Sequence, residues 1–306
     1  MLPDMNLPHI LYLENACQRV GLIPELGGSA ASWELRHNDA WMPLWRPFSS
    51  RPGQRIVANF PLLPWSNRLT GGGFHLDGRF HAVGPNRPDV AVPMHGTGWM
   101  HAWDVLQHDA CCIVLGVEAH HPLGYPWHFE ARQTYRIDGV RMSMRLEVTH
   151  LGEARLPYGL GFHPYILRPR HEADLRLRFG AGGLWECAER GLPSRHRHGL
   201  PAEWDFRELR PLGQGLIDHL FTGCDAQMRM ERRDLDLAID WHTTEPELLD
   251  MAILYRPEHG EWFCYEPVTH LTDAFNRRGM PGLRLLEKGQ SMALEIHQTL
   301  SRLSQP

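Results

Sequence analysis

The chain has 306 residues, a formal net charge of −5 and an isoelectric point near 6.5. These values give no basic surface for nucleic acid and disfavour an anionic membrane as a partner, so we expect neither. No stretch reaches the roughly 18 apolar residues of a membrane span, and the first residues do not resemble a secretory signal. Six cysteines without framework spacing predict free thiols and a cytoplasmic protein.

The predicted elements are short strands. Glycines at 71–73 and the Asp77-Gly78 step predict turns around a hairpin. Further along, apolar residues alternate with polar ones or form short apolar runs, as in strands with one face on a core. These stretches are residues 112–117, 141–149, 174–180, 234–240 and 292–296. The arginine- and histidine-rich residues 189–198 predict an exposed loop instead.

Helical periodicity is scarce, and no repeat, linker or change in composition divides the chain. We therefore expect one all-β domain over residues 1–306, because sandwiches and barrels of this size commonly form a single domain.

Four polar islands interrupt apolar surroundings: Asn67-Arg68, Met94-His95-Gly96, Gly161-Phe162-His163-Pro164-Tyr165 and Tyr265-Glu266-Pro267. A histidine and a carboxylate can together run acid–base chemistry without a cofactor. Glu266 follows an apolar strand, where a carboxylate is costly unless it is paired or used. His163 could equally be a satisfied core histidine, and Asp218 a polar residue at a strand end.

Common cofactor signals are missing from the sequence. It has no P-loop, no Gly-x-Ser-x-Gly elbow, no Cys-x-x-Cys pair, no His-Glu-x-x-His helix and no dinucleotide fingerprint. We therefore expect no cofactor and no metal.

Taken in order, the islands resemble the aldose 1-epimerase family, also called galactose mutarotases. The resemblance runs from about Gly21 to the C-terminus, and its landmarks are Asn67-Arg68, Phe74–Gly78, His95-Gly96, Gly161–Tyr165, Trp204–Arg207, Ile217–Phe221, Glu266 and Asp273–Asn276. It implies a large antiparallel β-sandwich, the galactose mutarotase-like supersandwich, with a sugar site on its concave face and a monosaccharide as the partner. We expect a monomer or a homodimer.

The resemblance also implies roles for single residues. Glu266 matches the family's general base and His163 its general acid. Asn67, Arg68, His95 and Asp218 are expected to bind sugar hydroxyls or assist the acid.

The implied reaction interconverts the α and β anomers of a hexose by opening and reclosing the ring. A carboxylate and an imidazolium, each keeping the other charged, suit that chemistry. We expect Glu266 and His163 on opposite sides of a gap as wide as a pyranose ring. Stacking candidates for the sugar are Trp65, Trp99 and Tyr165.

The sequence departs from the family at two places. Ile253 stands where the family often has a glutamine, and Pro267-Val268 replaces the usual Thr-Gln after the base. The preferred sugar therefore stays open.

Three alternatives remain. One is a hexose-6-phosphate 1-epimerase, which could recruit Arg55 or Arg87. Another is a non-catalytic carbohydrate-binding protein of the same fold. The third is a glycoside hydrolase with Asp218 and Glu266 as paired carboxylates.

Overall fold

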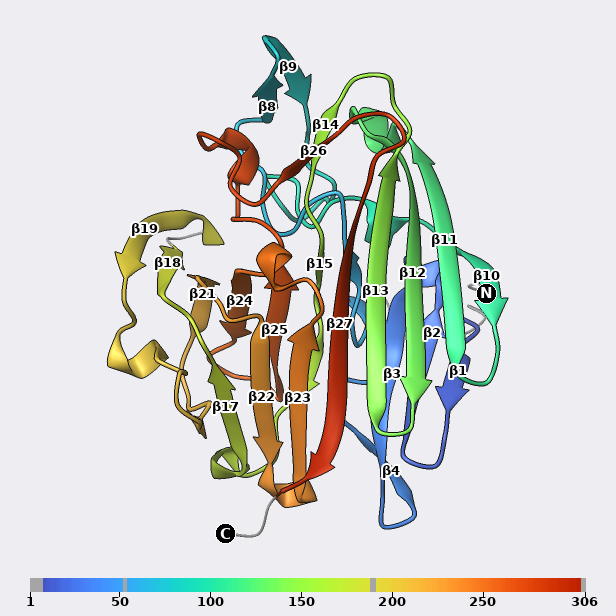
Figure 1. Cartoon of the computed structure of the whole chain (residues 1–306), viewed down its shortest axis with the longest axis vertical. Coiled ribbons are helices and arrows are strands. Elements are labelled where there is room, and N and C mark those ends of the chain that lie inside the picture. Colours follow the sequence, from blue (N-terminus) through green and yellow to red (C-terminus); the bar gives the residue numbers. More distant parts are fainter. Residues whose placement is uncertain (1–7, 52–53, 188–190, 304–306) are drawn as a thin grey trace.

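The computed structural model describes residues 8–51, 54–187 and 191–303, which fold mainly into antiparallel sheets (Figure 1). The largest sheet has nine strands, in the order β10 (Asp104–His108), β11 (Cys112–His120), β12 (His128–Asp138), β13 (Arg141–His150), β27 (Ser291–Arg302), β23 (Leu237–Thr243), β22 (Gln227–Arg232), β17 (Leu175–Phe179) and β20 (Arg210–Pro211). The second has eight, in the order β19 (Pro193–His198), β18 (Gly183–Cys187), β21 (Ile217–Thr222), β24 (Met251–Arg256), β25 (Trp262–Val268), β15 (Gly161–Phe162) and β7 (Pro61–Leu62), with β16 (Tyr165–Leu167) also paired to β25.

Smaller sheets flank these two. They are the four-stranded sheet β1 (Leu11–Glu14), β2 (Gln18–Ile23), β3 (Ser29–His37) and β4 (Ala40–Pro43), and the pairs β5 (Ser49–Arg51) with β6 (Gln54–Ile56), β8 (Gly73–Leu76) with β9 (Arg79–Ala82), and β14 (Leu156–Tyr158) with β26 (Arg284–Leu286). The predicted hairpin at 70–78 is confirmed as β8–β9, which projects at the top of Figure 1.

Helical segments in the described ranges are three-residue 3-10 turns: η1 (Pro24–Leu26), η2 (Gly98–Met100), η3 (Pro122–Gly124), η4 (Glu172–Asp174), η6 (Ala202–Trp204), η7 (Arg233–Leu235), η8 (Pro246–Leu248) and η9 (Ala274–Asn276). Among the described residues, none of these turns has the length or the apolar character to cross a membrane.

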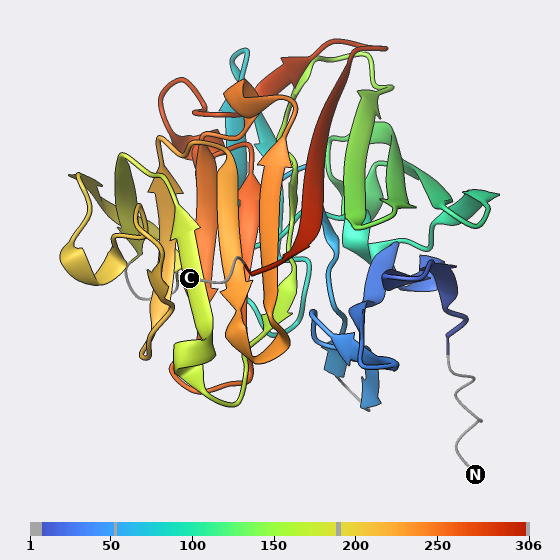
Figure 2. The same cartoon turned by 60° about the horizontal axis from the view of Figure 1, so that its bottom comes forward.

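The two large sheets pack face to face, which confirms the predicted all-β sandwich (Figure 1, Figure 2). Tyr265 of β25 shows the contact, since its ring centroid lies 5.3 Å from that of Phe179 on β17 and 5.9 Å from that of Trp241 on β23. The alternation of apolar and polar residues explains this packing. Every second side chain of a strand points to the same face, so the apolar side chains gather on the face toward the core.

Most predicted strands are confirmed, with two corrections. The strand expected over 234–240 begins at Leu237, because residues 233–235 form the turn η7. Residues 193–198, expected in a loop, form β19 at the edge of the eight-stranded sheet. Charged side chains are typical of edge strands, which explains why this stretch reads as a loop. The remainder of the expected loop includes residues 188–190, which lie outside the described ranges.

The eight-stranded sheet has a second face, turned away from the nine-stranded sheet, which we call the outer face. Along β25, Phe263 and Tyr265 belong to the core between the sheets, so Cys264 and Glu266 point to the outer face. A separate apolar cluster packs beside them, made of Leu62, Leu220, Ile253, Val268, Leu271 and Ala274. The outer face therefore carries Cys264 and Glu266 beside a buried apolar cluster.

Candidate active site on the outer face

Strand pairing brings His163 and Glu266 together. The register of β25 against β15 and β16 runs from Gly161↔Val268 to Tyr165↔Cys264, which places His163 opposite Glu266. The Nε2 atom of His163 lies 3.3 Å from Oε1 of Glu266. Both side chains are buried, with 8% and 3% of their residue surface exposed. The expected gap of a pyranose width between them is therefore wrong, because neighbouring strands hold the two groups in direct contact.

Aromatic rings fix the orientation of the His163 imidazole. Phe60 and Tyr165 stack on its two sides, each with a centroid separation of 4.7 Å. The guanidinium of Arg46 covers the Tyr165 ring at 3.7 Å. His163 is thus the centre of a stack that ends in a half-buried cation.

Burial sets the protonation of this pair. It lowers the pKa of His163 to about 3, and the Arg46 charge acts in the same direction. Burial also raises the pKa of Glu266 well above its usual range, with Asp218 adding to the rise and Arg68 opposing it. Both directions favour a free pair that is neutral and shares one proton. Both shifts act against the expected pair of opposite charges, because burial penalises the charged form of each group.

Asn67 and His95 lie on two adjoining turns that hold each other. The Asn67 backbone N–H donates to Nδ1 of His95 over 3.1 Å, and the His95 N–H donates to the Asn67 carbonyl over 2.8 Å. Burial lowers the pKa of His95 well below its usual value, so the ring is neutral. Because Nδ1 accepts, the ring proton lies on Nε2, which becomes a hydrogen-bond donor.

This donor lies in the same region as the pair of His163 and Glu266, which we call the dyad. The rings of His95 and His163 meet edge to face at 5.0 Å. Arg68 Nη1 donates to the Asn67 side-chain oxygen over 3.0 Å, which orients its guanidinium. Asp218 on β21 interacts electrostatically with Arg68 and Glu266, and burial raises its pKa. The structure therefore brings all six predicted residues into one region.

A carboxylate clamp holds the turn that carries Arg68. Asp273 accepts hydrogen bonds from the Thr70 N–H at 2.8 Å and the Thr70 hydroxyl at 2.7 Å, and its own N–H donates to the Arg68 carbonyl over 3.0 Å. Nε2 of His270 accepts from the Ser66 N–H at 2.9 Å on the preceding side. Sequence reasoning placed Asp273 among the family landmarks but missed this function, and it missed His270 altogether.

Ile253 borders the dyad on the other side. It pairs with Glu266 across β24 and β25, and its next neighbour in the row is Leu220 on β21. Both are almost fully buried. The wall beside Glu266 is therefore apolar where the family often places an amide.

The expected aromatic residues divide into two groups. Tyr165 contacts His163, and Trp99 lies 6.1 Å from Phe60 between ring centroids. Trp65 is wrong as a stacking candidate, because it is fully buried in the main core against Trp127.

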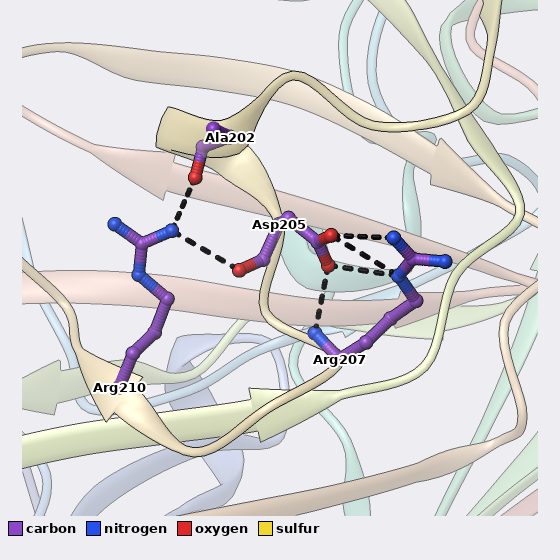
Figure 3. A network of polar contacts seen from close by, with 4 residues as sticks. All are labelled: Ala202, Asp205, Arg207 and Arg210. Carbon is purple, nitrogen blue, oxygen red and sulfur yellow. Dashed lines mark hydrogen bonds and ion pairs between the residues drawn. The ribbon is translucent and has the colours of Figure 1, made fainter.

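Two other stretches noted in the sequence make contacts outside the site. Asp205 in the 204–207 landmark binds the backbone and guanidinium of Arg207, while Arg210 donates to the carbonyls of Ala202 and Asp205 (Figure 3). This network braces a loop. Arg87, one of two arginines that a hexose-6-phosphate site could recruit, is paired with the Asp89 carboxylate.

The sequence model of the family described as aldose 1-epimerase matches residues 9–299. The chain belongs to the aldose 1-epimerase family. The Escherichia coli K12 protein YphB, described as uncharacterised, is 30% identical over 262 residues, covering 83% of this chain and 87% of YphB.

Solved structures of aldose 1-epimerase relatives share the fold. A candidate aldose 1-epimerase from Escherichia coli K12 matches with a TM-score of 0.88 and 26% identity, covering 96% of this chain and 99% of that one. A galactose 1-epimerase from Lactobacillus acidophilus NCFM matches with a TM-score of 0.77 and 16% identity, covering 96% and 94%. The predicted family and the galactose mutarotase-like fold are confirmed.

Proposed function

We propose that this chain catalyses the interconversion of the α and β anomers of a hexose. The observation that carries the proposal is the buried contact between His163 and Glu266 on the outer face, with Arg68 and His95 beside it. Family membership supports the reaction class.

The proposed chemistry needs one base and one acid at the same anomeric centre. Glu266 takes the proton of the C1 hydroxyl while His163 protonates the ring oxygen, and the roles reverse when the ring closes on the other face. Both sugar oxygens are bonded to C1, so they are neighbours. An acid and a base in contact can therefore serve both oxygens from one side, without the wide gap expected from sequence.

Because the dyad holds one shared proton, one of its two members can act as the acid while the other acts as the base. For the forward step this proton must lie on His163, which leaves Glu266 ionised. The nearby charge of Arg68 lowers the pKa of Glu266 and so favours that state. In this proposal Asn67, Arg68, His95 and Asp218 bind the sugar hydroxyls.

Polarimetry of freshly dissolved α-glucose and α-galactose tests the reaction. We expect the protein to accelerate the change in rotation, and Glu266→Gln to reduce the rate by at least about 100-fold, the usual contribution of a positioned base. Glu130→Gln, which changes an exposed carboxylate on β12, is the matched control and should keep the parent rate.

The alternatives give different results in the same assay. A non-catalytic sugar-binding protein would bind the sugars by calorimetry and leave the rotation rate unchanged. A hexose-6-phosphate 1-epimerase would accelerate the mutarotation of hexose 6-phosphates more than that of the free sugars. Release of nitrophenol from a nitrophenyl glycoside would indicate a hydrolase.

A further inference from the structure

Cys264 is a buried thiol beside the dyad that the proposed reaction does not use. It lies two residues before Glu266 on β25, so both side chains point to the outer face. It pairs across the strands with Tyr165, two residues after His163. The thiol is completely buried and is not in a disulfide.

Three different ligand types converge at this point. One nitrogen of His163, the sulfur of Cys264 and one carboxylate oxygen of Glu266 all lie within 4.8 Å of one another. A tetrahedral ion with bonds of about 2.0–2.3 Å has its ligand atoms roughly 3.3–3.8 Å apart. The 3.3 Å between His163 and Glu266 already fits one edge, and small side-chain movements bring the sulfur into range.

We propose that His163, Cys264 and Glu266 bind a thiophilic divalent cation, with Zn²⁺ and Cd²⁺ as the matching ions, and that the ion blocks sugar turnover. The inhibitory part rests on the proposed function, because the ion takes the two groups that would act on the sugar. Three protein ligands leave a fourth position for water, the arrangement of an open zinc site.

The polar atoms of the site support this assignment. Among the described residues, Oε2 of Glu266 is buried without a hydrogen-bond partner, so this carboxylate has an acceptor available for an ion. A carboxylate and a thiolate supply two negative charges, which match a dication in a setting with little water. Binding releases the thiol proton and the proton shared by the dyad.

The donor set also predicts selectivity. Thiolate and imidazole favour Zn²⁺ and Cd²⁺, whereas Mg²⁺ and Ca²⁺ prefer oxygen ligands. Mg²⁺ at the same concentration should therefore neither bind nor inhibit, and a chelator should restore full activity after Zn²⁺ addition.

Titration with Cd²⁺ tests binding without an activity assay, because a cadmium–thiolate bond produces an ultraviolet charge-transfer band. The titration uses a Cys111→Ser background, since Cys111 is the exposed thiol. We expect one saturating band that Cys264→Ser removes. Cys224→Ser, which changes a largely buried thiol outside this group, should keep the band.

Inhibition is measured by polarimetry with each variant compared to its own metal-free rate. We expect Cys264→Ser to raise the Zn²⁺ inhibition constant by at least about tenfold, since one of three ligands becomes a poor one. An unchanged constant, or a band that survives in Cys264→Ser, would overturn the proposed site. A band lost in Cys264→Ser from a protein that never accelerates mutarotation would support the metal site while rejecting the proposed function.

Discussion

The imidazole of His163 is held between the rings of Phe60 and Tyr165, with one nitrogen against Glu266. Such a residue has little rotational freedom left to lose when substrate binds, which suits a group that must meet one oxygen atom of a sugar. At this scale, the proposed reaction makes two predictions.

The first prediction concerns the acid. His163→Asn should lower kcat by about 10²–10⁴-fold and change KM much less, because the acid acts mainly as the ring oxygen gains charge. Steady-state polarimetry measures both constants. His150→Asn is the control, since it changes a buried histidine that binds Tyr158 rather than the dyad. A normal kcat with a raised KM in His163→Asn would make His163 a binding residue.

The second prediction concerns pH. The dyad is inactive when it gains a second proton, so activity is lost as pH falls through the pKa of His163. That pKa is lowered to about 3, far below the value of an ordinary histidine. Activity is also lost at higher pH, when the dyad releases its shared proton. This second loss should lie well above the usual carboxylate range, because the pKa of Glu266 is raised. The acid limb of the kcat/KM profile should therefore lie well below the ordinary histidine value of 6.5.

Arg46 supplies the variants for this profile. Arg46→Met removes a charge that lowers the pKa of His163, so the acid limb should move to higher pH. Arg46→Lys keeps the charge and should leave the limb nearly in place. An inflection of the parent near the ordinary histidine value of 6.5 would contradict the neutral shared-proton pair.

The elements position these residues through strand register and through one braced turn. The third prediction addresses that turn. Asp273→Ala removes two acceptors from Thr70, so it should cost about 1–3 kcal/mol of stability and raise KM more than it lowers kcat. The clamp orients Arg68 without touching the reacting atoms in our proposal.

A carboxylate outside the site provides a control that distinguishes an effect on the position of Arg68 from an effect on global stability. Asp109 also accepts two local hydrogen bonds, in its case from the backbone N–H groups of Cys111 and Cys112, in a hairpin outside the site. Asp109→Ala should lower the urea midpoint and leave KM unchanged. Equal KM effects in Asp109→Ala and Asp273→Ala would mean that the clamp acts only through global stability.

Sequence could predict the strands whose alternation is unbroken, such as β13 and β27, because burial of one face leaves a period of two. It could not predict the register between strands distant in sequence, which puts Ile253 beside Glu266 and Asp218 one strand further. The contact between His163 and Glu266 was missed for the same reason. Trp65 was misplaced because a tryptophan near a polar island has the same local pattern whether it faces core or site.

At the scale of the whole molecule, buried histidines couple folding to pH. Burial lowers the pKa of His95, His163 and His270, to about 3 for His163 and about 4 for His270. As pH falls through the unfolded value of 6.5, the unfolded chain takes up protons that the folded chain refuses. Each histidine therefore removes stability as pH falls. Glu266 acts oppositely, because its pKa is raised and the folded chain keeps a proton that the unfolded chain loses.

The fourth prediction follows from this balance. Between pH 7.5 and 5.5 the three histidines should remove more stability than the raised carboxyls of Glu266 and Asp218 return, so stability should fall by an amount on the order of 1 kcal/mol. Urea unfolding at the two pH values measures the change, and His270→Asn should reduce it. Equal or greater stability at pH 5.5 would contradict the assignment. The single domain expected from sequence stays a prediction, which one cooperative transition in these experiments would support.

The two-residue spacing within the site restricts how this chain can diverge. His163 and Tyr165 share a face, as do Cys264 and Glu266, because each pair is separated by one residue that points the other way. Inserting or deleting a single codon between the members of a pair would turn one of them into the core. Heritable length changes inside these strands must therefore come two residues at a time, whereas the turns between strands are free to lengthen by any number.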